Sequence, residues 1–196
     1  GYSGEITIGG VPLNEVNEIN LMQRVVLVRH NSYLFKGTVE ENLKMAKPDA
    51  TKEEMEAVLQ KVNLLGFLQT QDGLQTQLLE KASNLSGGQC QRLVIARALL
   101  RTDSAVYIFD EAASNIDVES EELIMNVIHE LAKTKTVLLI SHRLANVVKS
   151  DKIYFLKDGE IKESGKHDEL MSQNGAYRHL YESQMALENY GKGGMA

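Results

Sequence analysis

The stretch AVYIFDE, residues 105–111, decides the fold class of this chain. Its first five residues are apolar and have the length of a buried strand, and two carboxylates follow directly. A helix is predicted over 118–133, because apolar residues recur there at helical spacing after Asp117, a typical N-cap residue. A second apolar strand is predicted over 137–140. A strand, a helix and a strand in this order predict a right-handed βαβ unit, and so an α/β fold with a parallel sheet.

Both predicted strands end in residues that carry chemistry. Asp110 and Glu111 follow the first strand, and Ser141 and His142 follow the second. Because parallel strands end at one rim of a sheet, the two carboxylates and the imidazole are expected to meet there. A carboxylate can bind Mg²⁺, a second can orient or deprotonate a water molecule, and a neutral imidazole can donate to a phosphate. Each residue alone could equally cap a loop or begin a helix, but together they predict a phosphate-handling site.

A second candidate for anion binding lies before this strand, in the tetrapeptide Ser86-Gly87-Gly88-Gln89. It begins a helix predicted to run to about Leu100. Two glycines at the start of a helix leave backbone N–H groups accessible at the positive end of the helix dipole, which is a favourable place for an anion. The alternative is an ordinary helix start that happens to contain glycine.

The remaining elements are predicted from shorter patterns. Thr51 and Glu54 form a capping-box pair that predicts a helix over 51–62. Asp158-Gly159 predicts a tight hairpin turn. The other expected elements are strands over 5–8 and 25–28, a turn at Gly9-Gly10, hairpin strands over 153–156 and 160–163, short helices over 168–171 and 176–187, and a flexible tail over 191–196.

Composition limits the classes of protein to which the chain can belong. Its 196 residues suit one domain, and 43% of them are apolar, enough for a buried core. The net charge of −6 argues against a nucleic-acid partner. The single cysteine, Cys90, excludes an internal disulfide and suits a reducing compartment. No apolar stretch approaches the roughly 18 residues of a transmembrane helix, and no signal peptide is visible.

Together these segments resemble the ATPase domain of ABC transporters. The motifs that carry the resemblance occur in the family's order: the signature NLSGGQ at 84–89, the Walker B strand VYIFDE at 106–111, the D-loop SNID at 114–117 and the switch SHR at 141–143. In addition, residues 34–42 resemble the segment that faces the membrane-spanning partner in exporter-type domains. The resemblance covers nearly the whole chain.

The resemblance implies a parallel-sheet, P-loop-NTPase-like ATPase core over 1–190, with a helical signature subdomain over about 40–100. It implies ATP and Mg²⁺ as ligands, a second ABC ATPase domain as partner in a homodimer or heterodimer, and a transmembrane domain that is driven from the cytoplasmic face of a membrane. In such a pair each ATP lies between the Walker loops of one domain and the signature of the other. The roles implied are Mg²⁺ binding for Asp110, water polarisation for Glu111, γ-phosphate contact for His142, contact with the partner's ATP for Ser86, Gly87, Gly88 and Gln89, and communication across the dimer for Asp117.

Two features depart from the family pattern. No Gly-x-x-x-x-Gly-Lys-Ser/Thr loop occurs in the sequence, so we expect an N-terminally truncated ATPase fold that is inactive by itself, although the parent protein is an ATPase. His30 stands where the family has the Q-loop glutamine; histidine is a poor Mg²⁺ ligand, but it can hydrogen-bond a water or a phosphate.

Two alternatives to a complete transporter ATPase stay open. One is a non-hydrolysing piece that offers only its signature face to another domain. The other is an ABC-like ATPase of DNA repair or chromosome machinery. That second class predicts long heptad insertions and basic surfaces, and the sequence has neither.

Overall fold

A computed structural model describes residues 3–114 and 116–193, with side chains described as far as Leu187. The chain divides into two compact units, Gly1–Ile140 and Ser141–Ala196. No helix among the described residues combines the length and the apolar character that a membrane crossing requires.

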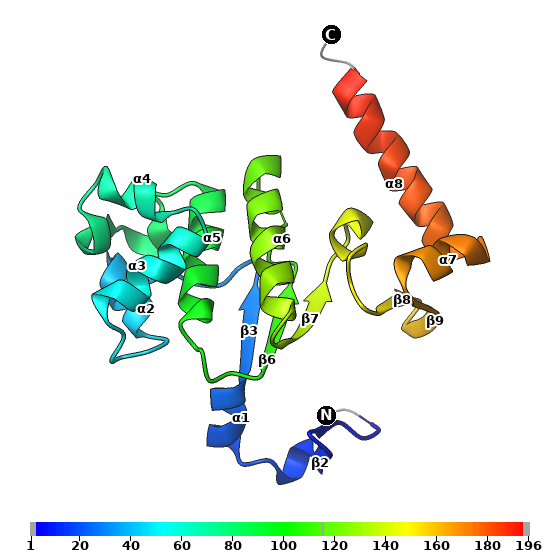
Figure 1. Ribbon diagram of the computed structural model, residues 1–196, viewed down its shortest axis with the longest axis horizontal. Helices are drawn as coiled ribbons and strands as arrows, with labels where there is room; N and C mark the ends of the chain where they lie inside the picture. Colours follow the sequence, from blue (N-terminus) through cyan, green and yellow to red (C-terminus); the bar gives the residue numbers. More distant parts are fainter. Residues whose placement is uncertain (1–2, 115, 194–196) are drawn as a thin grey trace. The chain divides into compact units, whose positions relative to one another are not determined.

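The first unit is built on the predicted parallel sheet (Figure 1). Its strands are β3 (Val25–Arg29), β6 (Val106–Asp110) and β7 (Thr136–Ile140), in the order β3-β6-β7, and both pairings are parallel. Arg29 is paired with Asp110, and Asp110 with Ile140, so the three strands end at one rim. The α/β fold class is therefore confirmed.

Two long helices cover one face of this sheet. α5 (Gly87–Leu99) packs against β3, α6 (Val118–Ala132) packs against β7, and the two helices contact each other. Both helices were predicted, and Asp117 is the N-cap of α6 as expected. Beneath the helices, alternate strand residues are buried: Val26, Val28, Tyr107 and Phe109.

Short helices pack around α5 on its other side. They are α2 (Val39–Lys44) and α3 (Lys52–Lys61), which contact α5, and α4 (Leu65–Gln69), which contacts α3. The small antiparallel pair β4 (Gly37–Thr38) and β5 (Gln77–Leu78) flanks these helices in the sequence. Only α3 was predicted, and its Thr51 and Glu54 form the expected capping box. The connections between these elements include short 3-10 turns, η2 (Gly73–Gln75) and η3 (Glu80–Ala82).

The N-terminal part of the first unit begins with a very short hairpin. β1 (Thr7–Ile8) pairs with β2 (Val11–Pro12) around Gly9 and Gly10, whose φ angles are +60° and +81°. Both angles are in the left-handed region that glycine adopts without cost, as the turn requires. The hairpin is followed by η1 (Leu13–Glu15) and α1 (Glu18–Arg24), which has Asn17 as its N-cap.

The second unit contains a hairpin and two helices. β8 (Ile153–Lys157) and β9 (Glu160–Gly165) are antiparallel and joined by Asp158 and Gly159, both at positive φ, as the tight turn predicts. The helices are α7 (His167–Gln173) and α8 (Ala176–Gly193), and the short 3-10 helix η4 (Leu144–Val147) lies before the hairpin in the sequence. α8 extends to Gly193, and residues 194–196 of the predicted tail lie outside the described residues.

Candidate nucleotide site

The rim of the sheet brings three of the predicted site residues together. Asp110 is the last residue of β6 and Glu111 follows it. The Glu111 amide donates to the carbonyl of Ile140 at 3.0 Å, and the His30 amide donates to the carbonyl of Asp110 at 3.2 Å. Backbone hydrogen bonds therefore continue past the end of the sheet and hold His30, Asp110 and Glu111 at neighbouring positions.

Glu111 has an unusual backbone conformation. Its φ is +52°, in the left-handed region that residues other than glycine rarely adopt. Ser114 stabilises the turn, because its amide and its hydroxyl both donate to the Glu111 carbonyl, at 3.0 and 2.9 Å. A conformation of this kind costs on the order of 1–3 kcal/mol and is found most often at functional sites. Glu111 is one of six described residues other than glycine with positive φ, and it is the one that lies at the sheet rim and that the sequence marks as the candidate base.

A cation that no sequence pattern indicated also lies at this rim. Arg29, the last residue of β3, has its Nε 3.8 Å from Oδ2 of Asp110, and both side chains are partly exposed, at 58% and 39%. The Arg29 carbonyl accepts from the Ser32 amide at 3.1 Å and from Nε2 of Gln91 at 3.4 Å. The adjacency of Arg29 to His30 was visible in the sequence, but its pairing with Asp110 depends on strand register, which was not predicted.

The carboxylate of Asp110 is the group at the rim that suits a magnesium ion. No cluster of three or more histidine, cysteine, aspartate or glutamate side chains that could hold a metal is found in the described part of the chain. Mg²⁺ in nucleotide sites commonly takes only one or two carboxylates, with phosphate oxygens and water completing the shell. The partly exposed carboxylate of Asp110 fits that arrangement as a single protein ligand.

The signature segment forms the capped start of α5. The Gln89 amide donates to Ser86 Oγ at 3.2 Å, and the Ser86 amide donates to Gln89 Oε1 at 2.9 Å, which is a reciprocal capping box. The two polar side chains expected to contact a phosphate thus have a structural task in the helix cap. An anion at this helix end would meet the amides of Gly87 and Gly88, which the cap does not use.

The start of α6 lies against the start of α5. A Cβ on Gly88 would lie 2.9 Å from the Cβ of Ser120 and 3.0 Å from Oδ2 of Asp117. Asp117 caps α6 by accepting from the Ser120 amide at 2.8 Å, and this hydrogen bond lowers the pKa of the Asp117 carboxyl. Two motifs from different parts of the sequence, the signature and the D-loop, are therefore in direct contact. No sequence pattern predicted this contact, and Asn115 of the D-loop lies outside the described residues.

His142 belongs to the second unit, since the first ends at Ile140. Its convergence with Asp110 and Glu111 therefore stays a prediction.

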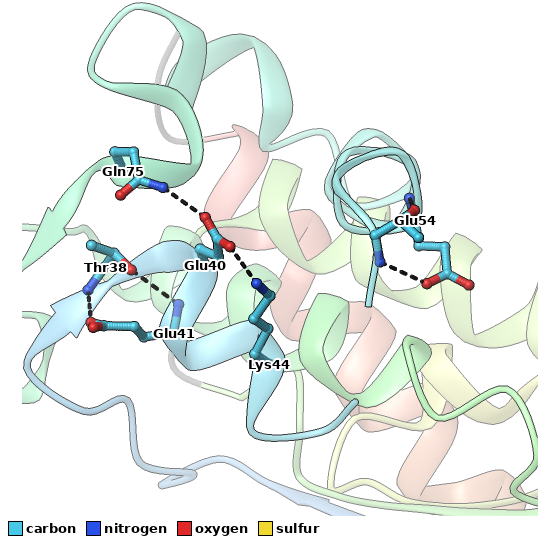
Figure 2. Close-up of polar contacts among 7 residues, drawn as sticks. Thr38, Glu40, Glu41, Lys44, Glu54 and Gln75 are labelled. Atoms are coloured by element: carbon cyan, nitrogen blue, oxygen red, sulfur yellow. Dashed lines mark hydrogen bonds and ion pairs between the residues drawn. The ribbon is translucent and has the colours of Figure 1, made fainter. Parts of the chain in front are cut away.

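The segment that resembles the membrane-facing surface of exporters is ordered by polar contacts (Figure 2). Thr38 and Glu41 form a capping box at the start of α2, with bonds of 2.7 and 3.0 Å. Glu40 accepts from Lys44 and from Gln75, both at 2.6 Å, so α2 is tied to η2. The Lys44 hydrogen bond lowers the pKa of the Glu40 carboxyl.

A buried amide fixes the loop before α2. Asn42 accepts from the Phe35 amide at 2.8 Å and donates to the carbonyls of Phe35 and Thr38 at 2.9 and 3.0 Å. The loop presents the exposed rings of Tyr33 and Phe35, whose centroids are 4.8 Å apart. Arg97 of α5 donates to the Tyr33 carbonyl at 2.8 Å, so this aromatic surface is attached to the signature helix.

Comparison with known proteins identifies the family. Residues 1–114 match the sequence profile of the ABC transporter family. An uncharacterized ABC transporter ATP-binding protein of Haemophilus influenzae is 50% identical over 185 residues, which are 94% of this chain and 33% of that protein. An ATP-dependent lipid A-core flippase of Vibrio vulnificus is 41% identical over 184 residues, 93% of this chain and 31% of the flippase. The chain thus spans about a third of the length of the curated relatives it matches.

A solved structure supports the same assignment. A bacterial Atm1-family ABC exporter with ATP bound superposes with a TM-score of 0.86 at 29% sequence identity, over 93% of this chain and 32% of that one. The shared fold, the matched profile and the order of the motifs agree with one another. This chain belongs to the ABC transporter family.

Proposed function

We propose that this chain forms most of the ATP-binding and ATP-hydrolysing domain of an exporter-type ABC transporter. The observation that carries the proposal is the end of β6, where Asp110 and Glu111 lie at the sheet rim and Glu111 adopts left-handed backbone geometry. The names of the relatives, an ABC transporter ATP-binding protein and an ATP-dependent flippase, favour the same activity. No observation favours a role in DNA repair.

In this proposal the rim handles the phosphates of ATP. Asp110 would hold Mg²⁺, which neutralises charge on the phosphate oxygens during phosphoryl transfer. Glu111 would orient and polarise the attacking water, while His142 would hold the γ-phosphate. His30 would hydrogen-bond a water or a phosphate in place of the family's glutamine. Such sites act by positioning and by charge stabilisation, and no covalent intermediate with the protein is needed.

The signature segment would serve a nucleotide held by a second domain. Ser86, Gly87, Gly88 and Gln89 would face the phosphates of the partner's ATP, and the amides at the start of α5 would supply the donors. Asp117 would carry the signal across the pair. The partner is a second ABC ATPase domain, in a homodimer or a heterodimer.

The remaining surface would connect the ATPase to a transmembrane domain at the cytoplasmic face of a membrane. We assign the helical signature subdomain to about residues 40–100, a range that contains α3, α4, α5 and all but the first residue of α2. The rings of Tyr33 and Phe35 lie beside this region and would contact the membrane-spanning partner. Closing and reopening of the ATPase pair would then drive the attached domain.

The test is the substitution Glu111→Gln in the complete natural protein. It keeps the size of the side chain but removes the base, so ATP turnover should fall at least a hundredfold while ATP binding persists. Phosphate release measures turnover, and equilibrium binding of labelled ATP measures affinity. Glu15→Gln, an exposed carboxylate in η1, is the matched control and should change neither. Unchanged turnover in the Glu111 variant would contradict the proposal.

A further inference from the structure

The contact between the starts of α5 and α6 leaves no room for a side chain at position 88. Gly88 is buried, and a Cβ there would lie 2.9 Å from the Cβ of Ser120, closer than such atoms approach in proteins, with the Ser120 hydroxyl also in contact. Ser120 is itself 5% exposed, so it cannot turn away into solvent at low cost. Addition of one methyl group would therefore push the two helix starts apart.

The neighbouring glycine provides an internal comparison. Gly87 is exposed, and a Cβ there would meet no atom within 4 Å. Neither glycine has a φ in the left-handed region, so the backbone conformation does not require glycine at either position. Space is therefore what requires glycine at position 88, and the neighbour that takes the space belongs to the same chain.

Ser120 lies between two candidate functional segments. On one side it packs on Gly88 of the signature, and on the other its amide donates to Oδ1 of Asp117 at 2.8 Å. Asp117 also approaches the Gly88 position, with its Oδ2 3.0 Å from the place a Cβ would occupy. The signature helix and the D-loop residue are thus held at a short, fixed separation by one buried serine.

We propose that Ser120 is a positioning residue that packs on Gly88 and fixes Asp117 to the signature segment, so that the two move as one body during the ATP cycle. This inference rests on the proposed function, because it gives the contact a role in catalysis. In this inference, glycine is needed at position 88 because α6 of the same chain packs against it. If Gly88 served only to contact a phosphate, the nucleotide would be the reason instead.

The test is a rescue experiment in the complete natural protein. Gly88→Ala should lower the unfolding temperature by roughly 4–8 °C and reduce kcat by about tenfold or more, because the helix starts separate. Ser120→Gly removes both clashing atoms. The double variant Gly88→Ala with Ser120→Gly should therefore recover the kcat of Ser120→Gly alone to within about threefold. Ser120→Ala keeps the Cβ at 2.9 Å and should rescue only in part.

Two other glycines serve as controls. Gly66 of α4 has open space around its Cβ position, so Gly66→Ala should change neither the unfolding temperature nor kcat. Gly87→Ala should leave the unfolding temperature unchanged, because nothing lies within 4 Å.

If Ser120→Gly fails to restore kcat in the Gly88→Ala background, Gly88 serves the nucleotide and the inference is wrong. A wild-type protein without ATPase activity would overturn the proposed function, and with it the catalytic role of the contact. The unfolding temperatures would still show whether Ser120 is what requires glycine at position 88.

Discussion

The two faces of the central sheet differ in exposure, although the residues on both are apolar. Val26, Val28 and Phe109 lie under α5 and α6 and are at most 6% exposed. On the opposite face Leu27 is 48% exposed and Leu138 is 51% exposed. All of these residues are apolar, and strands with apolar residues on both sides are typical of parallel sheets that are covered on both faces. The second face therefore has the composition of a buried surface, and no described element of the first unit covers it.

The edge of the sheet shows the same difference. β6 is paired on both sides, whereas β7 pairs only with β6 in the part of the chain that the structure describes. An edge strand with exposed apolar residues favours pairing with another segment or chain. The covered face and the bare face should therefore respond differently to substitution.

The largest expected effect is a difference between two truncations of core-type residues. Phe109→Ala should lower the free energy of unfolding of the 196-residue chain by about 3–5 kcal/mol, because it leaves a cavity under the helices. Leu138→Ala, on the bare face, should lower it by less than about 1 kcal/mol, since the side chain is half exposed. Urea unfolding measures both. Equal costs would mean that the bare face is covered in solution.

The next effect concerns nucleotide affinity at the rim. The 196 residues contain no Gly-x-x-x-x-Gly-Lys-Ser/Thr loop, which supplies backbone donors, a lysine and a hydroxyl to the phosphates. We therefore predict that this chain by itself binds Mg-ATP more weakly than about 1 mM, at least a thousandfold or about 4 kcal/mol below a micromolar site, and does not turn it over. Isothermal titration checks the binding. Saturable micromolar binding that Asp110→Asn abolishes would show that the rim alone is sufficient.

The smallest effect is on association. If copies of the chain associate through the bare face and the edge of β7, Leu138→Glu should weaken self-association of the 196-residue chain by about tenfold, or 1.4 kcal/mol. Sedimentation over a range of concentrations measures this. Val118→Glu replaces an even more exposed apolar residue at the start of α6, 70% against 51% for Leu138, and is the control. If both variants associate alike, the contact is not specific to the bare face.

Local patterns were sufficient for much of the fold. Asp117 was predicted as an N-cap and Thr51 with Glu54 as a capping box, and both were confirmed, because caps depend on neighbouring residues alone. The hairpin at Asp158-Gly159 was found for the same reason. α1, α2 and α4 were missed, since helices of five to seven residues are too short for periodicity to stand out.

The candidate site shows where such reasoning ends. Strand order predicted that Asp110 and Glu111 lie at a sheet rim, as they do. The pairing of Arg29 with Asp110 could not be predicted, because it depends on the register between strands that are far apart in the sequence. The left-handed conformation of Glu111 was also invisible, since glutamate has no local preference for it.

By itself, the sequence determined the family and the parallel sheet and nominated the candidate site residues, because motifs and strand patterns are local properties of the chain. Only the tertiary structure decided which face of the sheet is covered and which neighbour requires glycine at position 88. Gly87 and Gly88 are adjacent and identical in type, yet one faces open space and the other faces Ser120. The physical reason is that the space at each glycine depends on how α5 and α6 pack together, and the sequence of one helix alone does not determine that packing.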